Sequence, residues 1–177
     1  ATAKAFDISL TDALSALDAY EAPPGRGRIL AGKNGSVIID DSYNSSPAAV
    51  EEALKTLKVF PHTRRIAVLG DMLELGRYSV TEHERIAVLA GESADVIVTV
   101  GIRARGFATT PKNAEVLQFD NARAAASALV DFVRSGDIIL VKGSQSIRTE
   151  RIVEALLANP KDASKLVRQE KKWKQKP

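Results

Sequence analysis

Several residue types are scarce or absent in this sequence of 177 residues, which has no cysteine, one methionine, one tryptophan and two histidines. The absence of cysteine excludes disulfides, thiolate nucleophiles and cysteine metal sites, and it suits a reducing cytoplasm, where we expect the protein to lie. With only His62 and His83, a histidine-rich metal site is excluded as well. The sequence also lacks an uncharged apolar run of about 18 residues and a signal-like start, so neither a membrane span nor export is predicted.

The composition is that of a globular protein with a packed core, because 45% of the residues are hydrophobic and 27% are charged. The net charge of +3 is unevenly distributed. Residues 161–177 carry seven lysines or arginines against two acidic residues, a net of +5, which leaves −2 for the other 160 residues. Nucleic-acid binding by this basic tail is one alternative, but the rest of the chain offers no basic face, and we expect no nucleic-acid partner.

Short β-branched runs alternate with helical stretches, a pattern typical of a doubly wound α/β sheet. The Asn-Gly pair within residues 32–35 favours the positive φ angles of a tight hairpin. Runs such as 37–39 and 138–141 are apolar on both faces, as in parallel strands covered by helices on either side. We predict a mostly parallel six-stranded sheet with an antiparallel edge hairpin, with strands at 28–31, 36–40, 65–69, 96–100, 114–119 and 137–141, and helices at 48–60, 80–90, 121–133 and 148–158.

The first twenty residues are predicted to be helical, with Ser9 and Asp12 forming a capping box. Pro-Pro-Gly within residues 21–25 then breaks the pattern, and we place a domain boundary between residues 24 and 25. Because the sequence starts at Ala1, without methionine and inside an apolar pattern, we expect the first 24 residues to be a helical remnant of an upstream domain.

Further helix signals occur at Ser46-Pro47, a cap followed by proline, and at Ser79 with Glu82, a second predicted capping box. Residues 160–177 are predicted to form a basic terminal helix. An apolar stripe that includes Trp173 would dock this helix onto the domain, while its lysines face the solvent.

Polar side chains follow several predicted strands at their carboxyl ends, where ligands bind in doubly wound sheets. They lie in 40–44 (Asp-Asp-Ser-Tyr-Asn), 70–76 (Gly-Asp-Met-Leu-Glu-Leu-Gly) and 142–146 (Lys-Gly-Ser-Gln-Ser). Together they predict a site for a polar or anionic ligand. Each segment also has a structural interpretation, since an aspartate can cap a turn and His83 can be a core histidine.

Residues 27–34 match the spacing of a phosphate-binding loop, except that Asn34 stands where the motif needs serine or threonine. Strand-like residues on both sides favour a hairpin over the strand–loop–helix of a true phosphate loop. We therefore predict no triphosphate cradle in this chain.

Four groups of residues, in order along the chain, resemble the C-terminal third of the Mur ligases. They are Pro-Gly-Arg at 24–26, Asp-Asp-Ser-Tyr-Asn with Pro47, Gly-Asp-Met-Leu-Glu-Leu-Gly with His83, and Val-Lys-Gly-Ser at 141–144. The most similar branch is the MurF type, which adds D-alanyl-D-alanine to a UDP-N-acetylmuramoyl tripeptide in peptidoglycan precursor synthesis. The resemblance implies a Rossmann-like C-terminal domain from Gly25 onward, in a cytoplasmic and monomeric enzyme.

The resemblance also implies roles on the nucleotide side. ATP would convert the tripeptide carboxyl group to an acyl phosphate, and ATP and Mg²⁺ would be bound mainly by a central domain outside this chain. This chain alone would be inactive. Arg26 would reach the γ-phosphate, a sensible match for a guanidinium. Asp41 would accept hydrogen bonds from the ATP ribose, and Tyr43 and Asn44 would line the nucleotide side of the cleft.

For the incoming dipeptide, the resemblance implies that Asp71, Lys142 and Ser144 border the D-alanyl-D-alanine pocket. The sequence departs from the family pattern at Ser45-Ser46, where Ala-Asn is usual, and at Gln145, where arginine is common. These departures concern the identity of the amine substrate more than the fold.

A receiver-like phosphoacceptor domain is the alternative from another class. Its acidic pair would be Asp40 and Asp41, its phosphoacceptor Asp71 and its lysine Lys142, holding magnesium and an acyl phosphate. Against it, Asp71 follows the strand immediately after the acidic pair, without the intervening strand that such domains have.

Overall fold

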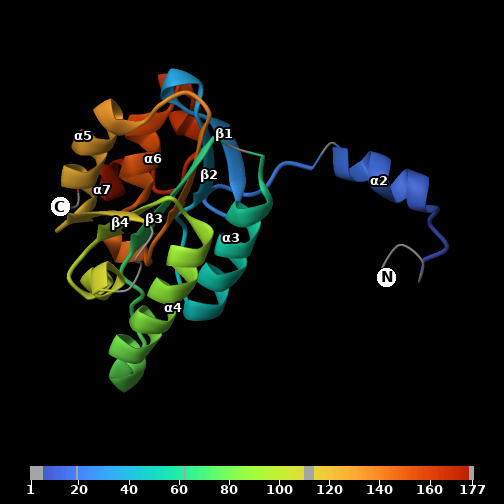
Figure 1. Cartoon of the computed structure of the whole chain (residues 1–177). Helices are drawn as coiled ribbons and strands as arrows, with labels where there is room; N and C mark the ends of the chain where they lie inside the picture. Colours follow the sequence, from blue (N-terminus) through green and yellow to red (C-terminus); the bar gives the residue numbers. More distant parts are fainter. Residues whose placement is uncertain (1–5, 19, 62, 110–113, 176–177) are drawn as a thin grey trace.

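The structure is a computed structural model, and it describes residues 6–18, 20–61, 63–109 and 114–175, so that His62 lies outside the described residues. Most of the chain forms an α/β domain, with α2 joined to it by an extended segment (Figure 1). In chain order the elements are α2 (Leu10–Asp18), β1 (Arg28–Ala31), β2 (Val37–Asp41), α3 (Pro47–Val59), β3 (Arg64–Gly70), α4 (Ser79–Ser93), β4 (Val96–Val100), β5 (Glu115–Phe119), α5 (Ala122–Phe132), β6 (Asp137–Lys142), α6 (Glu150–Leu156) and α7 (Lys171–Lys174).

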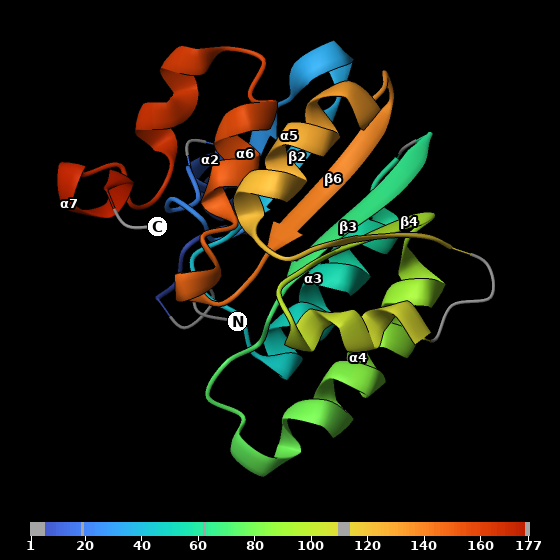
Figure 2. The same cartoon turned by 90° about the vertical axis from the view of Figure 1, so that its left-hand side faces the viewer.

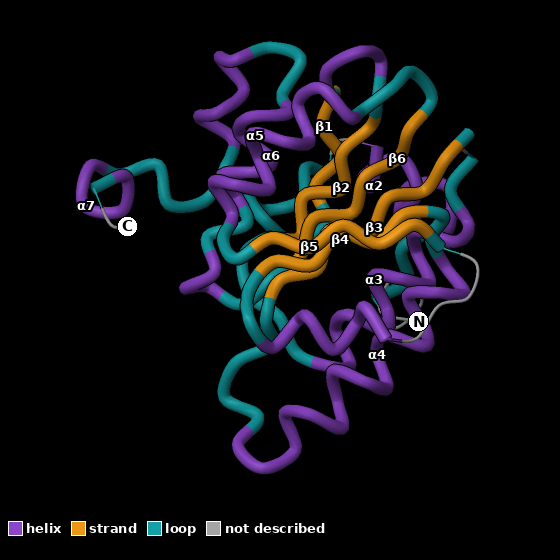
Figure 3. The backbone as a smooth tube through the Cα atoms, turned by 60° about the vertical axis from the view of Figure 1, so that its left-hand side comes forward, coloured by secondary structure: helices purple, strands orange, loops and turns teal. Residues whose placement is uncertain are grey.

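The six strands form one sheet in the order β1-β2-β6-β3-β4-β5 (Figure 3). Only the β1–β2 pair is antiparallel in this sheet, and the other neighbours are parallel. The hairpin between β1 and β2 turns through Asn34 and Gly35, which have φ angles of 57° and 76°. The predicted sheet, its edge hairpin and the doubly wound α/β class are therefore confirmed.

Helices cover both faces of the sheet, with α3 and α4 on one face and α5 and α6 on the other (Figure 2). Each face has its own apolar core, one built around Val50, Leu54 and Leu57 of α3, the other around residues of α5 and α6. Every residue of β4 is buried, because a parallel strand covered on both sides meets apolar neighbours above and below. The polypeptide returns from β5 through α5 to place β6 between β2 and β3.

The N-terminal segment is less buried than the α/β domain, and the predicted helix over the first twenty residues is only partly confirmed, because residues 6–9 are not helical and α2 covers Leu10–Asp18. Ser9 and Asp12 form the predicted capping box at α2, with Ser9 Oγ donating to Asp12 Oδ2 at 2.6 Å and accepting from Asp12 N at 3.1 Å. None of the residues of α2 is buried, and its leucines are exposed. The domain boundary after residue 24 stays a prediction.

Two of the helix predictions are wrong. Ser79 already has helical φ and ψ angles, and the residue before α4, Tyr78, makes no side-chain cap. The expected basic terminal helix over 160–177 is instead a 3₁₀ turn (Pro160–Lys165), an extended stretch and the four-residue α7. Arg168 interrupts it with a φ of 59°, because its guanidinium is bound inside the domain. No helix among the described residues is both long and apolar enough to cross a membrane.

Candidate functional site

Two cavities reach the carboxyl ends of the parallel strands, and both are lined by Asn44, Ser45 and Ser46, which form a shared wall. The edge cavity, about 730 Å³, lies between the β1–β2 hairpin and α3. The central cavity, about 630 Å³, is lined by the loops that follow β3 and β6. Both cavities lie beside β6. The helix after β6 covers one face of the sheet, while the helices after β2 and β3 cover the other (Figure 2). Doubly wound sheets bind ligands at such a switch point.

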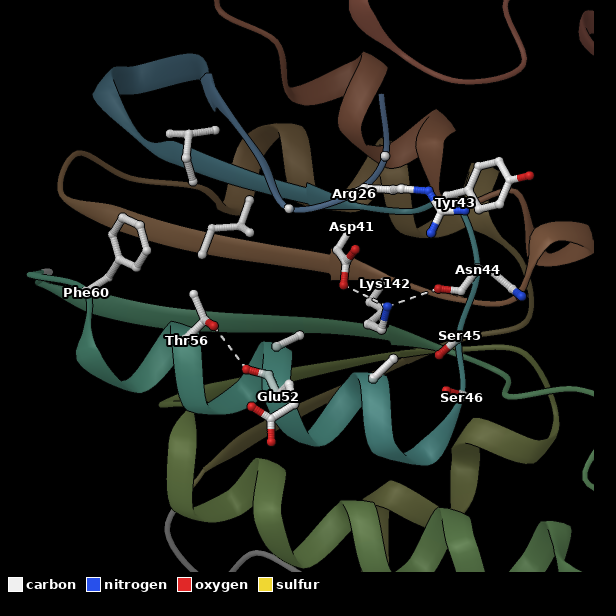
Figure 4. Close-up of a pocket in the computed structure, with 16 residues that line it drawn as sticks. Arg26, Asp41, Tyr43, Asn44, Ser45, Ser46, Glu52, Thr56, Phe60 and Lys142 are labelled. Atoms are coloured by element: carbon white, nitrogen blue, oxygen red, sulfur yellow. Dashed lines mark hydrogen bonds and ion pairs between the residues drawn. The ribbon is translucent and has the colours of Figure 1, made fainter. Parts of the chain in front are cut away.

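The polar end of the edge cavity is organised by Lys142 (Figure 4). Its side chain is only 3% exposed, so its charge requires partners in the protein. The Nζ atom donates to Asp41 Oδ2 at 2.7 Å and to the Asn44 carbonyl at 3.0 Å. Asp41 and Lys142 are Cα partners in the parallel β2–β6 ladder, so the register of the sheet brings these two charges together.

Arg26 reaches the same end of the edge cavity from the turn before β1 (Figure 4). Its guanidinium carbon lies 4.2 Å from the centroid of the Tyr43 ring, a cation–π contact that leaves the planar group near the cavity. The turn depends on Gly25, which has a φ of 67° and accepts a hydrogen bond from Tyr43 N at 3.0 Å. A Cβ atom there would lie 2.9 Å from Tyr43 N, so glycine is needed at this position.

Asp40, the neighbour of Asp41, is fully buried and has a structural role. Its carboxylate accepts hydrogen bonds from Gly25 N at 3.2 Å, Ser42 N at 3.2 Å and Ser42 Oγ at 2.5 Å. Burial raises the pKa of Asp40 above its ordinary value, although the hydrogen bonds from Ser42 and Gly25 oppose this. The alternation of side chains along β2 therefore separates an inward aspartate that braces the Gly25 turn from an outward one at the cavity.

This burial predicts a specific pH dependence of stability. Between the ordinary value of 3.8 and the raised pKa, the folded protein binds more protons at Asp40 than the unfolded chain does. The free energy of unfolding should therefore fall as the pH rises through this window, with a slope from this group of at most about 1.4 kcal/mol per pH unit. In Asp40→Asn this contribution is absent. Urea unfolding of both proteins from pH 4 upward measures the difference in slope, and identical slopes would contradict the assignment.

The central cavity combines apolar and polar walls. It is lined by Asn44, Ser45, Ser46, Leu73, Glu74, Leu75, Ser144, Gln145, Ser146, Arg148 and Trp173. Ser144 holds the loop after β3 in place, because its Oγ accepts from Leu73 N at 2.8 Å and its N–H donates to the Asp71 carbonyl at 3.0 Å. Glu74 has a φ of 65° and an exposed side chain, so a carboxylate on a strained turn lies at this cavity.

The Asp71 carboxylate lies at neither cavity. It is buried and accepts a hydrogen bond from Ala104 N at 2.7 Å, while Arg103 lies 4.0 Å away. Gly101, with a φ of 109°, makes room for it, because a Cβ atom there would lie 2.6 Å from the carboxylate. Asp71 therefore braces the turn after β4. This arrangement gives no support to a receiver-like domain, in which Asp71 would be an accessible phosphoacceptor.

His83 is also structural, in agreement with the core interpretation of this residue. It is 2% exposed and lies on α4. Nε2 accepts from Met72 N at 3.1 Å, and Nδ1 lies 2.6 Å from the Ser79 carbonyl, which assigns the proton to Nδ1. The histidine thus fixes the start of the Met72–Leu75 loop that borders the central cavity.

A buried ion network links the cavities to the C-terminal segment, which we define as residues 166–174. Glu150, 1% exposed, lies between the Arg148 guanidinium at 2.5 Å and that of Arg168 at 3.1 Å. Arg168 also donates to the Ser42 and Tyr43 carbonyls. Burial lowers the pKa of Arg168, and Glu150 opposes this effect. The network therefore ties the loop after β2 to a segment more than a hundred residues further along the chain.

Six of the seven predicted site residues line one or both cavities, and the seventh, Asp71, lines neither. Arg26, Asp41, Tyr43, Asn44 and Lys142 line the edge cavity, and Asn44 and Ser144 line the central one. Lys142 thus lies with the predicted nucleotide-side residues and not with Ser144, while Asp71 lines neither cavity.

The sequence gives no sign of the roles of Arg148, Glu150 and Arg168. It points to Glu74 only as part of the polar 70–76 segment and to Trp173 only as a docking residue. The nearest signal is the Arg-Thr-Glu run of 148–150 directly after a polar strand end and before an apolar helix.

These features define an α/β domain with two adjoining cavities beside the switch point of a doubly wound sheet. A family model described as "Mur ligase, glutamate ligase domain" matches residues 25–145. This match covers more than half of the chain, and the chain belongs to the Mur ligase family.

Curated relatives and solved structures agree with this membership. The UDP-N-acetylmuramoyl-tripeptide–D-alanyl-D-alanine ligase of Bacillus subtilis is 29% identical over 161 residues, covering 88% of this chain and 35% of the relative. The Mycobacterium tuberculosis enzyme of the same name is 32% identical over 165 residues, covering 78% and 32%. The crystal structure of the MurF ligase from Thermotoga maritima in complex with ADP superimposes with a TM-score of 0.71 at 28% identity, covering 87% of this chain and 35% of that one. The chain thus spans about a third of the length of the relatives it matches.

Proposed function

We propose that this chain is the C-terminal domain of a MurF-type ligase that adds D-alanyl-D-alanine to a UDP-N-acetylmuramoyl tripeptide. The observation that carries the proposal is the pair of cavities that share the Asn44–Ser46 wall, because a ligase must bring an activated carboxyl group and an amine together. The names of the relatives support the substrates, and the ADP complex of the Thermotoga maritima enzyme supports a nucleotide. We place the enzyme in the cytoplasm and expect a monomer.

The edge cavity is the nucleotide side in this proposal. ATP would supply the phosphoryl group that activates the tripeptide carboxyl group as an acyl phosphate. Arg26 would bind the γ-phosphate, since a guanidinium stays charged and pairs with phosphate oxygens in two parallel hydrogen bonds. Asp41, held in place by Lys142, would accept hydrogen bonds from ribose hydroxyl groups, with Tyr43 and Asn44 beside them.

Magnesium would be held outside this site. No group of three or more histidine, aspartate or glutamate side chains among the described residues could bind a metal ion. Asp41 also already accepts a hydrogen bond from Lys142. The metal ligands would therefore come with the nucleotide and from a part of the ligase that this chain does not span.

The central cavity is the dipeptide side. Glu74 offers a carboxylate for the ammonium group, and Leu73 and Leu75 offer apolar contacts for the methyl groups. Ser144 would act by positioning, because its hydroxyl group already holds the Leu73 backbone. The amine would meet the acyl phosphate at the shared wall, within reach of both cavities.

Hydrogen exchange of this chain with and without D-alanyl-D-alanine tests the dipeptide assignment. We expect slower amide exchange in residues 73–75 and 144–146, because these loops line the central cavity. L-alanyl-L-alanine at the same concentration is the control for stereochemistry. Protection confined to segments outside both cavities, or no protection at all, would contradict the assignment.

A further inference from the structure

The C-terminal segment supplies one wall of the central cavity. Leu166 is 4% exposed and packs into the core shared by α5 and α6, which anchors the segment at its start. Trp173, near its end, lines the central cavity beside Arg148. Among the described residues, no other aromatic side chain lines this cavity. This wall comes from the part of the chain that looked, in the sequence, like a basic tail.

Trp173 is held through its backbone and through its ring. The Trp173 carbonyl accepts a hydrogen bond from Arg148 Nη1 at 2.9 Å, and Trp173 N donates to the Glu170 carbonyl at 2.9 Å. The guanidinium carbons of Arg148 and Arg168 lie 5.5 Å and 5.8 Å from the ring centroid. Both arginines are in turn held by the buried Glu150. The ring is therefore a braced part of the cavity wall, although α7 itself has only four residues.

The chemistry of the lining indicates what such a wall would do. Its apolar side chains are Leu73, Leu75 and Trp173, and the remaining side chains are polar or charged. Among the three, Trp173 has the largest and most rigid side chain. Alkyl groups of a bound dipeptide would have to pack against these three residues, so a bulky ring limits the space for them.

We propose that Trp173 is a specificity-determining residue for the incoming dipeptide, limiting its side chains to the size of a methyl group. The inference rests on the proposed function, because it takes the central cavity to be the dipeptide site. Removing the ring would enlarge the cavity, while the backbone hydrogen bond from Arg148 to the Trp173 carbonyl would remain available. The variant would then accept a larger side chain than the unaltered protein does.

Binding measurements with two dipeptides test this directly. We would measure dissociation constants of D-alanyl-D-alanine and D-alanyl-D-leucine by calorimetry, for this chain and for Trp173→Ala, Trp173→Phe and Lys172→Ala. The unaltered chain should prefer D-alanyl-D-alanine by about tenfold or more, as expected for side chains rejected by size. Trp173→Ala should bring the ratio close to one, and Trp173→Phe should keep most of the preference. Lys172→Ala, an exposed neighbour on α7, should leave the ratio unchanged.

Fluorescence provides a second readout, since Trp173 is the one tryptophan of the sequence. D-alanyl-D-alanine should change the emission of the unaltered chain and of Lys172→Ala with the same dissociation constant that calorimetry gives. Circular dichroism of each variant confirms that it is folded.

The outcomes separate this inference from the proposed function. If Trp173→Ala kept the same preference between the two dipeptides, the role of Trp173 would be overturned and the proposed function would stay intact. The same would follow if the unaltered chain bound D-alanyl-D-alanine without a change in its emission. Loss of both dipeptides in both Trp173 variants would also overturn the role of Trp173, showing that the segment only holds the cavity together. Failure of the unaltered chain to bind D-alanyl-D-alanine would overturn both.

Discussion

Replacing Arg26 with alanine should lower the turnover of the assembled ligase by about 10²–10³-fold, the usual effect of removing one group that stabilises transition-state charge. The assembled ligase here means this chain mixed with the N-terminal and central domains of a MurF-type ligase as a separate polypeptide. The fold should survive, because the Arg26 side chain is exposed and its contact with the Tyr43 ring contributes about 0.5–1 kcal/mol. Phosphate release that depends on D-alanyl-D-alanine measures the effect.

Arg77→Ala is the matched control for this substitution. Arg77 also lies over a tyrosine ring, with its guanidinium carbon 4.9 Å from the Tyr78 centroid, but it lines neither cavity. It should therefore leave turnover unchanged while removing a similar surface contact. Equal turnover of Arg26→Ala and the unaltered ligase would exclude the phosphate role of Arg26.

Replacing Glu150 with glutamine should destabilise this chain by about 3–5 kcal/mol, the typical cost of removing one partner from a buried ion network. Glu150 is 1% exposed and carries the negative charge between two buried guanidinium groups. Without it, Arg148 and Arg168 remain buried with a neutral amide between them. The free energy of unfolding in urea measures the loss.

Glu154→Gln provides the comparison on the same helix. Glu154 pairs with Lys174 at 3.7 Å, and its side chain is 39% exposed. An exposed pair of this kind contributes about 0–1 kcal/mol, so the substitution should change stability little. If the two variants lost the same amount of stability, the buried network would contribute no more to stability than an exposed ion pair does.

The strands could be predicted from the sequence because their signals are local. Apolar β-branched runs and an Asn-Gly turn mark the sheet and its edge hairpin, and all six strands lie within one residue of the expected bounds. The gathering of polar side chains at the carboxyl ends of the strands could be predicted as well, since parallel strands end at the same edge of a sheet. The pairing of Asp41 with Lys142 could not be predicted from local signals, because it depends on which strand inserts beside β2.

The misplaced site residues all depend on contacts distant in sequence. The Asp71 carboxylate turns toward Ala104, 33 residues further on, so a pattern centred on residues 70–76 gives no sign of it. The structure of the C-terminal segment also depends on contacts with residues distant in sequence. An apolar stripe there favoured a helix, but the ion pair of Arg168 with Glu150 is buried and outweighs weak helical propensity in a short segment.

Assembly of activity from separate polypeptides measures most directly whether the two adjoining cavities of this domain bring nucleotide and dipeptide together. Neither this chain nor the N-terminal and central domains alone should release phosphate in a D-alanyl-D-alanine-dependent manner. The mixture should do so, and the release should saturate as the concentration of this chain is raised. If the mixture released no more phosphate than the N-terminal and central domains alone, this domain would not have the proposed role in the ligase reaction.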